Sequence, residues 1–180
     1  MISGSVAKRY ARALVDVAAA SDALERVHQD LRAFADLLAT QRELRHLLAN
    51  PSVPRKGADQ IVSDIVAVMG LSPLAVTFLH LLLDANRLAG LEAIIRTYES
   101  VMDERLGRVK AVVTSAALLD DAEQEQLRRR LCEVAGMPVY LELRQDPAIL
   151  GGVVSQIGSR VYDGSLKTQL ARLREELVRA

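Results

Sequence analysis

The segment 146–170, with the sequence DPAILGGVVSQIGSRVYDGSLKTQL, decides the fold class of the C-terminal part of the chain. Two adjacent glycines, an apolar run, a third glycine and an Asp-Gly-Ser break predict short strands at 152–157 and 160–163, followed by a helix that Ser165 caps. The segment contains no catalytic residue. The residues to which we assign a structural role in it are Gly151, Gly152, Gly158 and Asp163.

Two further strands are predicted upstream of this segment. Residues 109–115 and 139–144 alternate with the period of two that is typical of strands. Between them, Asp120 and Glu123 have the spacing of a capping box, which predicts the start of a helix. The second half of the chain therefore combines strands with one intervening helix, the pattern of a small α+β domain.

The first hundred residues are predicted to be helical, because apolar residues recur at steps of three and four. We expect a mainly α chain in which an N-terminal helical bundle, residues 1–106, is followed by a small α+β C-terminal domain, residues 107–180. The predicted N-terminal helices cover residues 5–20, 24–38, 43–48, 61–69, 73–84 and 88–107.

Local signals indicate where some of these helices begin and end. Asp22 and Glu25 have capping-box spacing ahead of the second helix. Ser72 is expected to cap the fifth helix with its side-chain oxygen, with Pro73 at the first helical position. Asn86 is expected to adopt the left-handed conformation that ends this helix.

Composition limits the possible functions. Lysine plus arginine equals aspartate plus glutamate, at 23 residues each, so no overall charge attracts the chain to nucleic acid or to an anionic membrane. The single cysteine, Cys132, excludes an internal disulfide and fits a reducing compartment. Apolar runs such as residues 65–69 fall short of the roughly 18–20 residues that cross a membrane, and no secretory signal is expected. We therefore expect no direct membrane insertion.

No side chains with suitable spacing suggest a catalytic or metal site. His28, His46 and His80 lie in separate predicted helices without the spacing of a zinc site. Cys132 has no activating partner nearby in the sequence, and neither the GxxxxGK[ST] nor the GxGxxG motif is present. We expect no enzymatic activity, no cofactor and no metal.

The basic run Arg128-Arg129-Arg130 lies in a predicted helix among acidic residues, as a solvated helix face would. With two Phe, four Tyr and no Trp, the chain offers few stacking platforms for nucleic acid, so no nucleic-acid partner is expected. The alternative hypothesis is an RNA-binding or regulatory α+β protein that uses this basic helix.

Two predicted helices carry more apolar surface than one buried face requires. In helix 5–20, charged residues four apart occupy one face, which predicts an inward face that includes Ala13 and Val17. Helix 73–84 is apolar nearly all round. Either both helices are bundle core, or they form a groove for a partner's amphipathic helix, in which alanines allow close approach. The candidate partner-binding residues are Ala7, Tyr10, Ala11, Leu14, Val76, Leu79 and Leu83.

Several motifs resemble those of the F-type ATP synthase delta subunit family, whose mitochondrial members are called oligomycin-sensitivity-conferring proteins. Residues 9–14, RYARAL, resemble its opening motif. Residues 84–88, DANRL, stand where that family often has an acidic-x-Gly-Arg-Leu turn. Residues 114–116 and 146–170 match further on, so the resemblance spans nearly the whole chain in the right order.

The resemblance implies a non-catalytic stator subunit of a proton-translocating F-type ATP synthase, present as one copy in a hetero-oligomer. In that family, the first and fifth helices of a six-helix N-terminal bundle bind the N-terminal helix of an alpha subunit. The C-terminal domain meets the C-terminal ends of the b subunits. Such a protein would clamp the catalytic head to the peripheral stalk against rotor torque, peripherally on the cytoplasmic side of a bacterial inner membrane.

Overall fold

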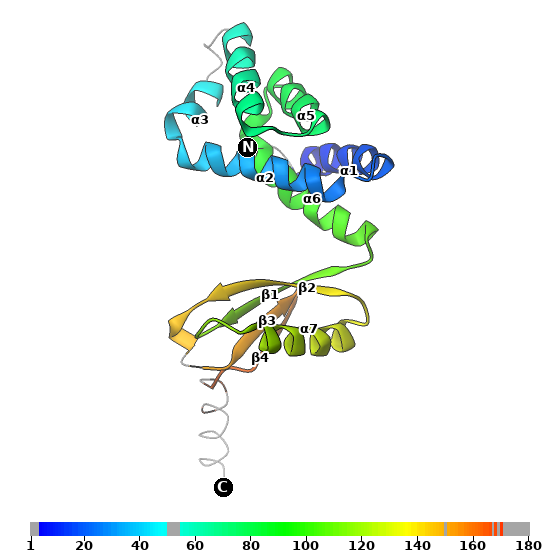
Figure 1. The fold of residues 1–180 in the computed structure, drawn as a ribbon, viewed down its shortest axis with the longest axis vertical. Helices are drawn as coiled ribbons and strands as arrows, with labels where there is room; N and C mark the ends of the chain where they lie inside the picture. Colours follow the sequence, from blue (N-terminus) through cyan, green and yellow to red (C-terminus); the bar gives the residue numbers. More distant parts are fainter. Residues whose placement is uncertain (1–3, 50–54, 150, 167, 169, 171–180) are drawn as a thin grey trace. The chain divides into compact units, whose positions relative to one another are not determined.

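A computed structural model describes residues 4–49, 55–149, 151–166, 168 and 170. The chain separates into two compact units, Met1–Met102 and Asp103–Ala180, whereas the sequence pattern placed the boundary after residue 106. The described residues are mainly helical, with one four-stranded sheet in the second unit (Figure 1). The predicted final helix lies mostly outside the described residues.

Helices make up the first unit. The predicted helix 88–107 is divided, because a 3-10 turn, η1 (Leu88–Gly90), precedes the α-helix and closes with a hydrogen bond from the Gly90 N–H to the Arg87 carbonyl at 2.9 Å. In the described part of the chain, the α-helices before the first strand are α1 (Gly4–Ala20), α2 (Leu24–Thr40), α3 (Arg42–Ala49), α4 (Arg55–Met69), α5 (Pro73–Asp84) and α6 (Leu91–Arg105).

The core of this unit is built mainly on α2, α5 and α6, which supply most of its largest fully buried side chains, Phe34, Leu79 and Tyr98 among them. The Tyr98 hydroxyl donates to the Leu24 carbonyl at 3.0 Å. Burial, with a smaller contribution from Glu25, raises the pKa of Tyr98 to about 12. The hydroxyl therefore stays protonated and keeps its donor role at physiological pH.

No single helix in the described ranges is long and apolar enough to span a membrane. The segments Pro73–Asp84 and Leu88–Arg105 reach the required length and apolar content only when they are taken together, and the chain bends by 117° at the break between them.

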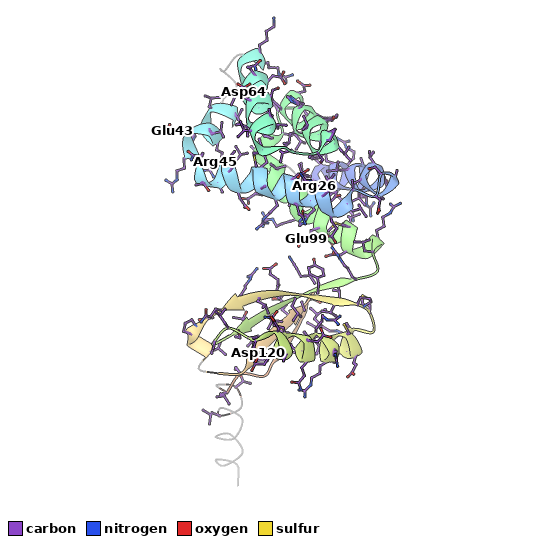
Figure 2. All side chains as sticks on the ribbon, viewed as in Figure 1. Arg26, Glu43, Arg45, Asp64, Glu99 and Asp120 are labelled. Atoms are coloured by element: carbon purple, nitrogen blue, oxygen red, sulfur yellow. The ribbon has the colours of Figure 1, made fainter. Side chains whose placement is uncertain are left out.

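A buried carboxylate joins α2 to the turn that precedes α5. Asp30, 4% exposed, accepts the backbone N–H of Ser72 at 2.8 Å and pairs with Arg26 at 3.1 Å. Arg26, labelled in Figure 2, also donates to the Gly70 carbonyl at 3.1 Å. Because these bonds hold both sides of the turn, they fix where α5 begins relative to α2.

Two of the predicted helix signals need correction. Asp22 does not cap α2: it has a φ of 51°, in the turn that ends α1, and the N-cap position falls on Ala23, without a side-chain cap. Ser72 is the N-cap of α5 with Pro73 in the first turn, as predicted, but its hydroxyl makes no cap bond and has no partner within the described residues. Its backbone N–H is held by Asp30 instead. The left-handed Asn86 is confirmed, with a φ of 55°.

The second unit has the strand order β2-β1-β3-β4. The pair β1–β2 is parallel, joined through α7, and the pairs β1–β3 and β3–β4 are antiparallel. The bounds agree with the predicted strands to within one residue. The elements are β1 (Val109–Ser115), α7 (Asp121–Ala135), β2 (Val139–Gln145), the 3-10 turn η2 (Pro147–Ile149), β3 (Val153–Ile157) and β4 (Arg160–Asp163).

Helix α7 lies against one face of the sheet (Figure 1). Its Leu131 packs with Ala111 and Val113 of β1 in a small second core. The predicted capping box is confirmed: Asp120, labelled in Figure 2, accepts the Glu123 N–H at 2.7 Å, and the Glu123 carboxylate accepts the Asp120 N–H at 2.9 Å. This reciprocal cap fixes the residue at which α7 begins.

The glycine pair lets the chain close tightly after β4. The Gly164 N–H donates to the Val153 carbonyl and the Leu166 N–H donates to the Gly151 carbonyl, each at 3.0 Å. Gly152 has a φ of 77°, and a Cβ there would overlap the carbonyl oxygen of Gly164. Only glycine satisfies both the backbone angle and the close approach. Asp163 accepts the Ser165 N–H at 2.9 Å within the same closure.

Replacement of Gly152 by alanine is expected to loosen this closure. Strain at positive φ together with the overlap should lower the opening free energy of β3 by about 2–4 kcal/mol. Amide hydrogen exchange of β3 measures this loss. Gly158→Ala is the matched control, because Gly158 has a φ of 57° but open space around it, and should cost only about 1–2 kcal/mol. Equal exchange rates in the two variants would contradict the steric argument.

Replacement of Asp30 by alanine is expected to destabilise the first unit by about 2–3 kcal/mol, because it leaves the buried Ser72 N–H without its acceptor and Arg26 without its ion-pair partner. Urea denaturation followed by circular dichroism measures the change. The control is Asp36→Ala on the same helix, whose pair with Arg32 is exposed and 3.7 Å long, and which should change stability by less than about 0.5 kcal/mol. A similar small effect in both variants would rule out the buried-carboxylate role.

Candidate partner-binding surfaces

The described residues contain no group of three or more His, Cys, Asp or Glu side chains that could hold a metal ion. His28 stacks on Tyr98 with ring centroids 6.2 Å apart, and His80 Nδ1 lies 2.6 Å from a carboxylate oxygen of Asp59. The sulfur of Cys132 accepts a backbone N–H of β2 at 3.2 Å. These side chains lie on separate elements and are not brought together.

Five of the seven predicted partner-binding residues are buried in the first unit. Ala7, Ala11 and Leu14 of α1 are 2%, 0% and 4% exposed. Leu79 and Leu83 of α5 are 0% and 9% exposed. All five belong to the core cluster of the helical unit. These five residues therefore pack in the core of the helical unit, as the bundle-core alternative expects.

Tyr10 and Val76, the other two, are half-buried but do not share a surface. The Tyr10 ring meets the Phe78 ring edge to face, with centroids 6.3 Å apart. Val76 precedes Phe78 by two residues, which places it about 200° around α5. It therefore lies on the opposite side of α5 from the contact with α1.

The apolar surface beside Tyr10 includes residues predicted to face inward. Val17 is 54% exposed and Ala13 is exposed, because the inward stripe of α1 follows Ala7, Ala11 and Leu14 instead. The prediction for Ala13 and Val17 was wrong. On α5, Leu81 is exposed to a similar degree, at 48%. We call this surface the α1–α5 face, defined by Val6, Tyr10, Ala13 and Val17 of α1 and Leu74, Phe78 and Leu81 of α5.

The three α5 residues of this face, Leu74, Phe78 and Leu81, were not among the predicted partner-binding residues, and neither were Val6, Ala13 and Val17 of α1. The α5 residues are spaced by four and then three, which places them along one side of α5. This spacing could not be recognised in the sequence, because α5 is apolar on nearly every side and no polar residue separates its core side from its exposed side.

An apolar groove runs between α7 and the β3–β4 edge of the sheet. It consists of two cavities of about 520 and 160 Å³ that share Leu127, Arg130 and Val153. Among its other lining residues, Val134 and Val161 are 53% and 58% exposed. We call it the α7–β4 groove, lined further by Leu119, Glu123, Gln126, Leu131, Ser155, Tyr162, Asp163 and Gly164.

The basic run on α7 is mostly engaged within its own helix. Glu125 pairs with Arg128 at 2.8 Å and with Arg129 at 3.0 Å. These hydrogen bonds lower the pKa of Glu125 to about 2, so the carboxylate stays charged at physiological pH. Arg130 lines the α7–β4 groove. The run does not form a continuous cationic strip for phosphates, and the RNA-binding alternative is not supported.

The chain matches a known family model along most of its length. The model described as ATP synthase delta (OSCP) subunit matches residues 6–177. The chain is 42% identical over 177 residues to a protein named ATP synthase subunit delta from Anaeromyxobacter sp. (strain Fw109-5), and the match covers 98% of this chain and 99% of that protein. It is 41% identical over 179 residues to the protein of the same name from Myxococcus xanthus, with 98% of both covered.

Solved structures share the fold. A chain in the Toxoplasma gondii mitochondrial ATP synthase hexamer superimposes with a TM-score of 0.70 at 22% identity, covering 96% of this chain and 97% of that one. A chain in the Polytomella F-ATP synthase, from a structure of the F1 head and rotor, gives a TM-score of 0.51 at 29% identity, covering 57% of this chain and 89% of that one.

Proposed function

The chain belongs to the ATP synthase delta (OSCP) subunit family, and on this premise we propose which surface meets which partner. It is a structural, non-catalytic stator subunit of an F-type ATP synthase. We propose that the N-terminal unit binds the catalytic head through the α1–α5 face, and that the C-terminal unit binds the peripheral stalk through the α7–β4 groove.

The mechanism is mechanical. A stator subunit keeps the alpha/beta head from turning with the rotor, so that torque reaches the catalytic sites instead of spinning the head. This task requires two separate attachment surfaces and rigid elements that hold them. The two compact units supply one candidate surface each.

We assign the N-terminal helix of an alpha subunit to the α1–α5 face, with α1 to α6 acting as the six-helix bundle of the family. The observation that carries this assignment is that Val17 and Leu81, from two helices that meet at the Tyr10–Phe78 contact, remain about half exposed. An amphipathic helix laid on this face would cover both residues, which contributes on the order of 1 kcal/mol each. The buried residues beneath make the face rigid, which limits the entropy lost on binding.

We assign the C-terminal ends of the b subunits to the α7–β4 groove. The groove is concave and apolar, and Arg130 places one positive charge at its wall. A helical end with an apolar stripe and a neighbouring carboxylate fits this lining. With one copy per complex, the protein would lie peripherally on the cytoplasmic side of a bacterial inner membrane.

Leu81→Asp is expected to weaken binding of a peptide with the N-terminal sequence of the alpha subunit by about tenfold or more, because it places a charge within the apolar contact. Isothermal titration calorimetry measures the affinity. Leu81 is half exposed, so the helical unit should keep its circular dichroism spectrum. The control is Val68→Asp on α4, at a residue that is 88% exposed and outside the face. Unchanged affinity for Leu81→Asp would remove the face assignment.

Val161→Asp is expected to weaken binding of a fragment from the C-terminal end of the b subunit by about tenfold while leaving alpha-peptide binding unchanged. Leu143→Asp is the matched control, because Leu143 is 41% exposed on β2, the opposite edge strand of the sheet. Surface plasmon resonance with the full chain compares the variants. If Leu143→Asp weakened binding of the b fragment and Val161→Asp did not, the stalk contact would lie at the β2 edge instead.

A further inference from the structure

Two arginines converge on one ring of the α1–α5 face. The guanidinium carbon of Arg9 lies 5.9 Å from the centroid of the Tyr10 ring, and that of Arg87 lies 5.7 Å from the same centroid. Arg9 comes from α1, whereas Arg87 comes from the turn after α5. Two cations from different elements therefore lie beside the aromatic residue at which the two helices meet.

The turn after α5 holds Arg87 in this position. Asp84 pairs with Arg55 of α4 at 3.5 Å, and Asn86 reverses the chain with its φ of 55°. The Arg87 N–H then donates to the Leu82 carbonyl at 2.8 Å, and Leu88 enters the core at 6% exposure. The DANRL motif thus fixes the backbone on both sides of Arg87, and the Arg87 side chain lies beside the Tyr10 ring.

Neither arginine forms an ion pair within the described part of the chain. Each guanidinium group lies within about 6 Å of the Tyr10 centroid, so a carboxylate placed at the edge of this ring would be attracted to both positive charges. Guanidinium groups bind carboxylates with well-defined geometry, often through two hydrogen bonds. Both groups can therefore pair with an anionic group beside the Tyr10 ring.

We propose that Arg9 and Arg87 form a clamp for an acidic side chain of the helix that docks on the α1–α5 face. This inference rests on the proposed function and adds a chemical requirement for the partner: a Glu or Asp beside its apolar stripe. A free anion would leave Val17 and Leu81 uncovered, so the acidic group belongs to an amphipathic helix. The apolar contact supplies most of the affinity, and the clamp fixes the position of the helix along the face.

The test measures binding of two peptides to the full chain by calorimetry. One has the N-terminal sequence of the alpha subunit from the same ATP synthase, and in the other each Glu and Asp is replaced by Gln and Asn. The unmodified peptide should bind about three- to tenfold more tightly, and added salt should reduce the difference. The double variant Arg9→Gln, Arg87→Gln should abolish the preference while still binding both peptides.

Arg12→Gln is the matched control, because Arg12 is exposed on α1 and lies about 200° around the helix from Tyr10. It should keep the preference intact. Equal binding of both peptides to the unmodified protein, or an alpha segment without acidic residues, would overturn the clamp and leave the apolar docking in place. Failure of the unmodified peptide to bind would instead contradict the proposed function.

Discussion

The position of α5 depends on one buried carboxylate. Asp30 holds the backbone N–H at the start of α5 and, with Arg26, secures the turn before it. One side of α5 packs in the core, and its other side carries the exposed Leu81. A small rotation of α5 would move Phe78 away from Tyr10 and would change the α1–α5 face. A polar contact in the interior of the unit thus determines the geometry of an apolar surface outside it.

Helix positions in the first unit could be predicted from the sequence, but their orientations could not. Apolar spacing of three and four locates α1 and α5 well, because helical periodicity is a local property. Which apolar side faces inward depends on neighbouring helices. Val17 shows this, since it was predicted to face inward and is exposed.

In the second unit, the strands and the capping box of α7 were predictable because alternation, glycine positions and cap spacing are all short-range signals. The α7–β4 groove was not predictable. It depends on the sheet order, which brings β3 and β4 alongside α7 although β2 lies between them in sequence. No local pattern encodes that pairing. Arg130 is an example: Arg128 and Arg129 pair with Glu125, whereas Arg130 lines the groove, and the sequence of the basic run does not distinguish the three.

The central position of β1 affects how the second unit responds to force. Along its whole length β1 pairs with β2, and its residues 111–115 also pair with β3. A pull along β1 must slide all of these hydrogen bonds at once, so they share the load in shear. A pull that peels β4 from β3 would break the bonds one after another at a much lower force. The mechanical resistance of this sheet therefore depends more on the direction of the applied force than on the number of hydrogen bonds between its strands.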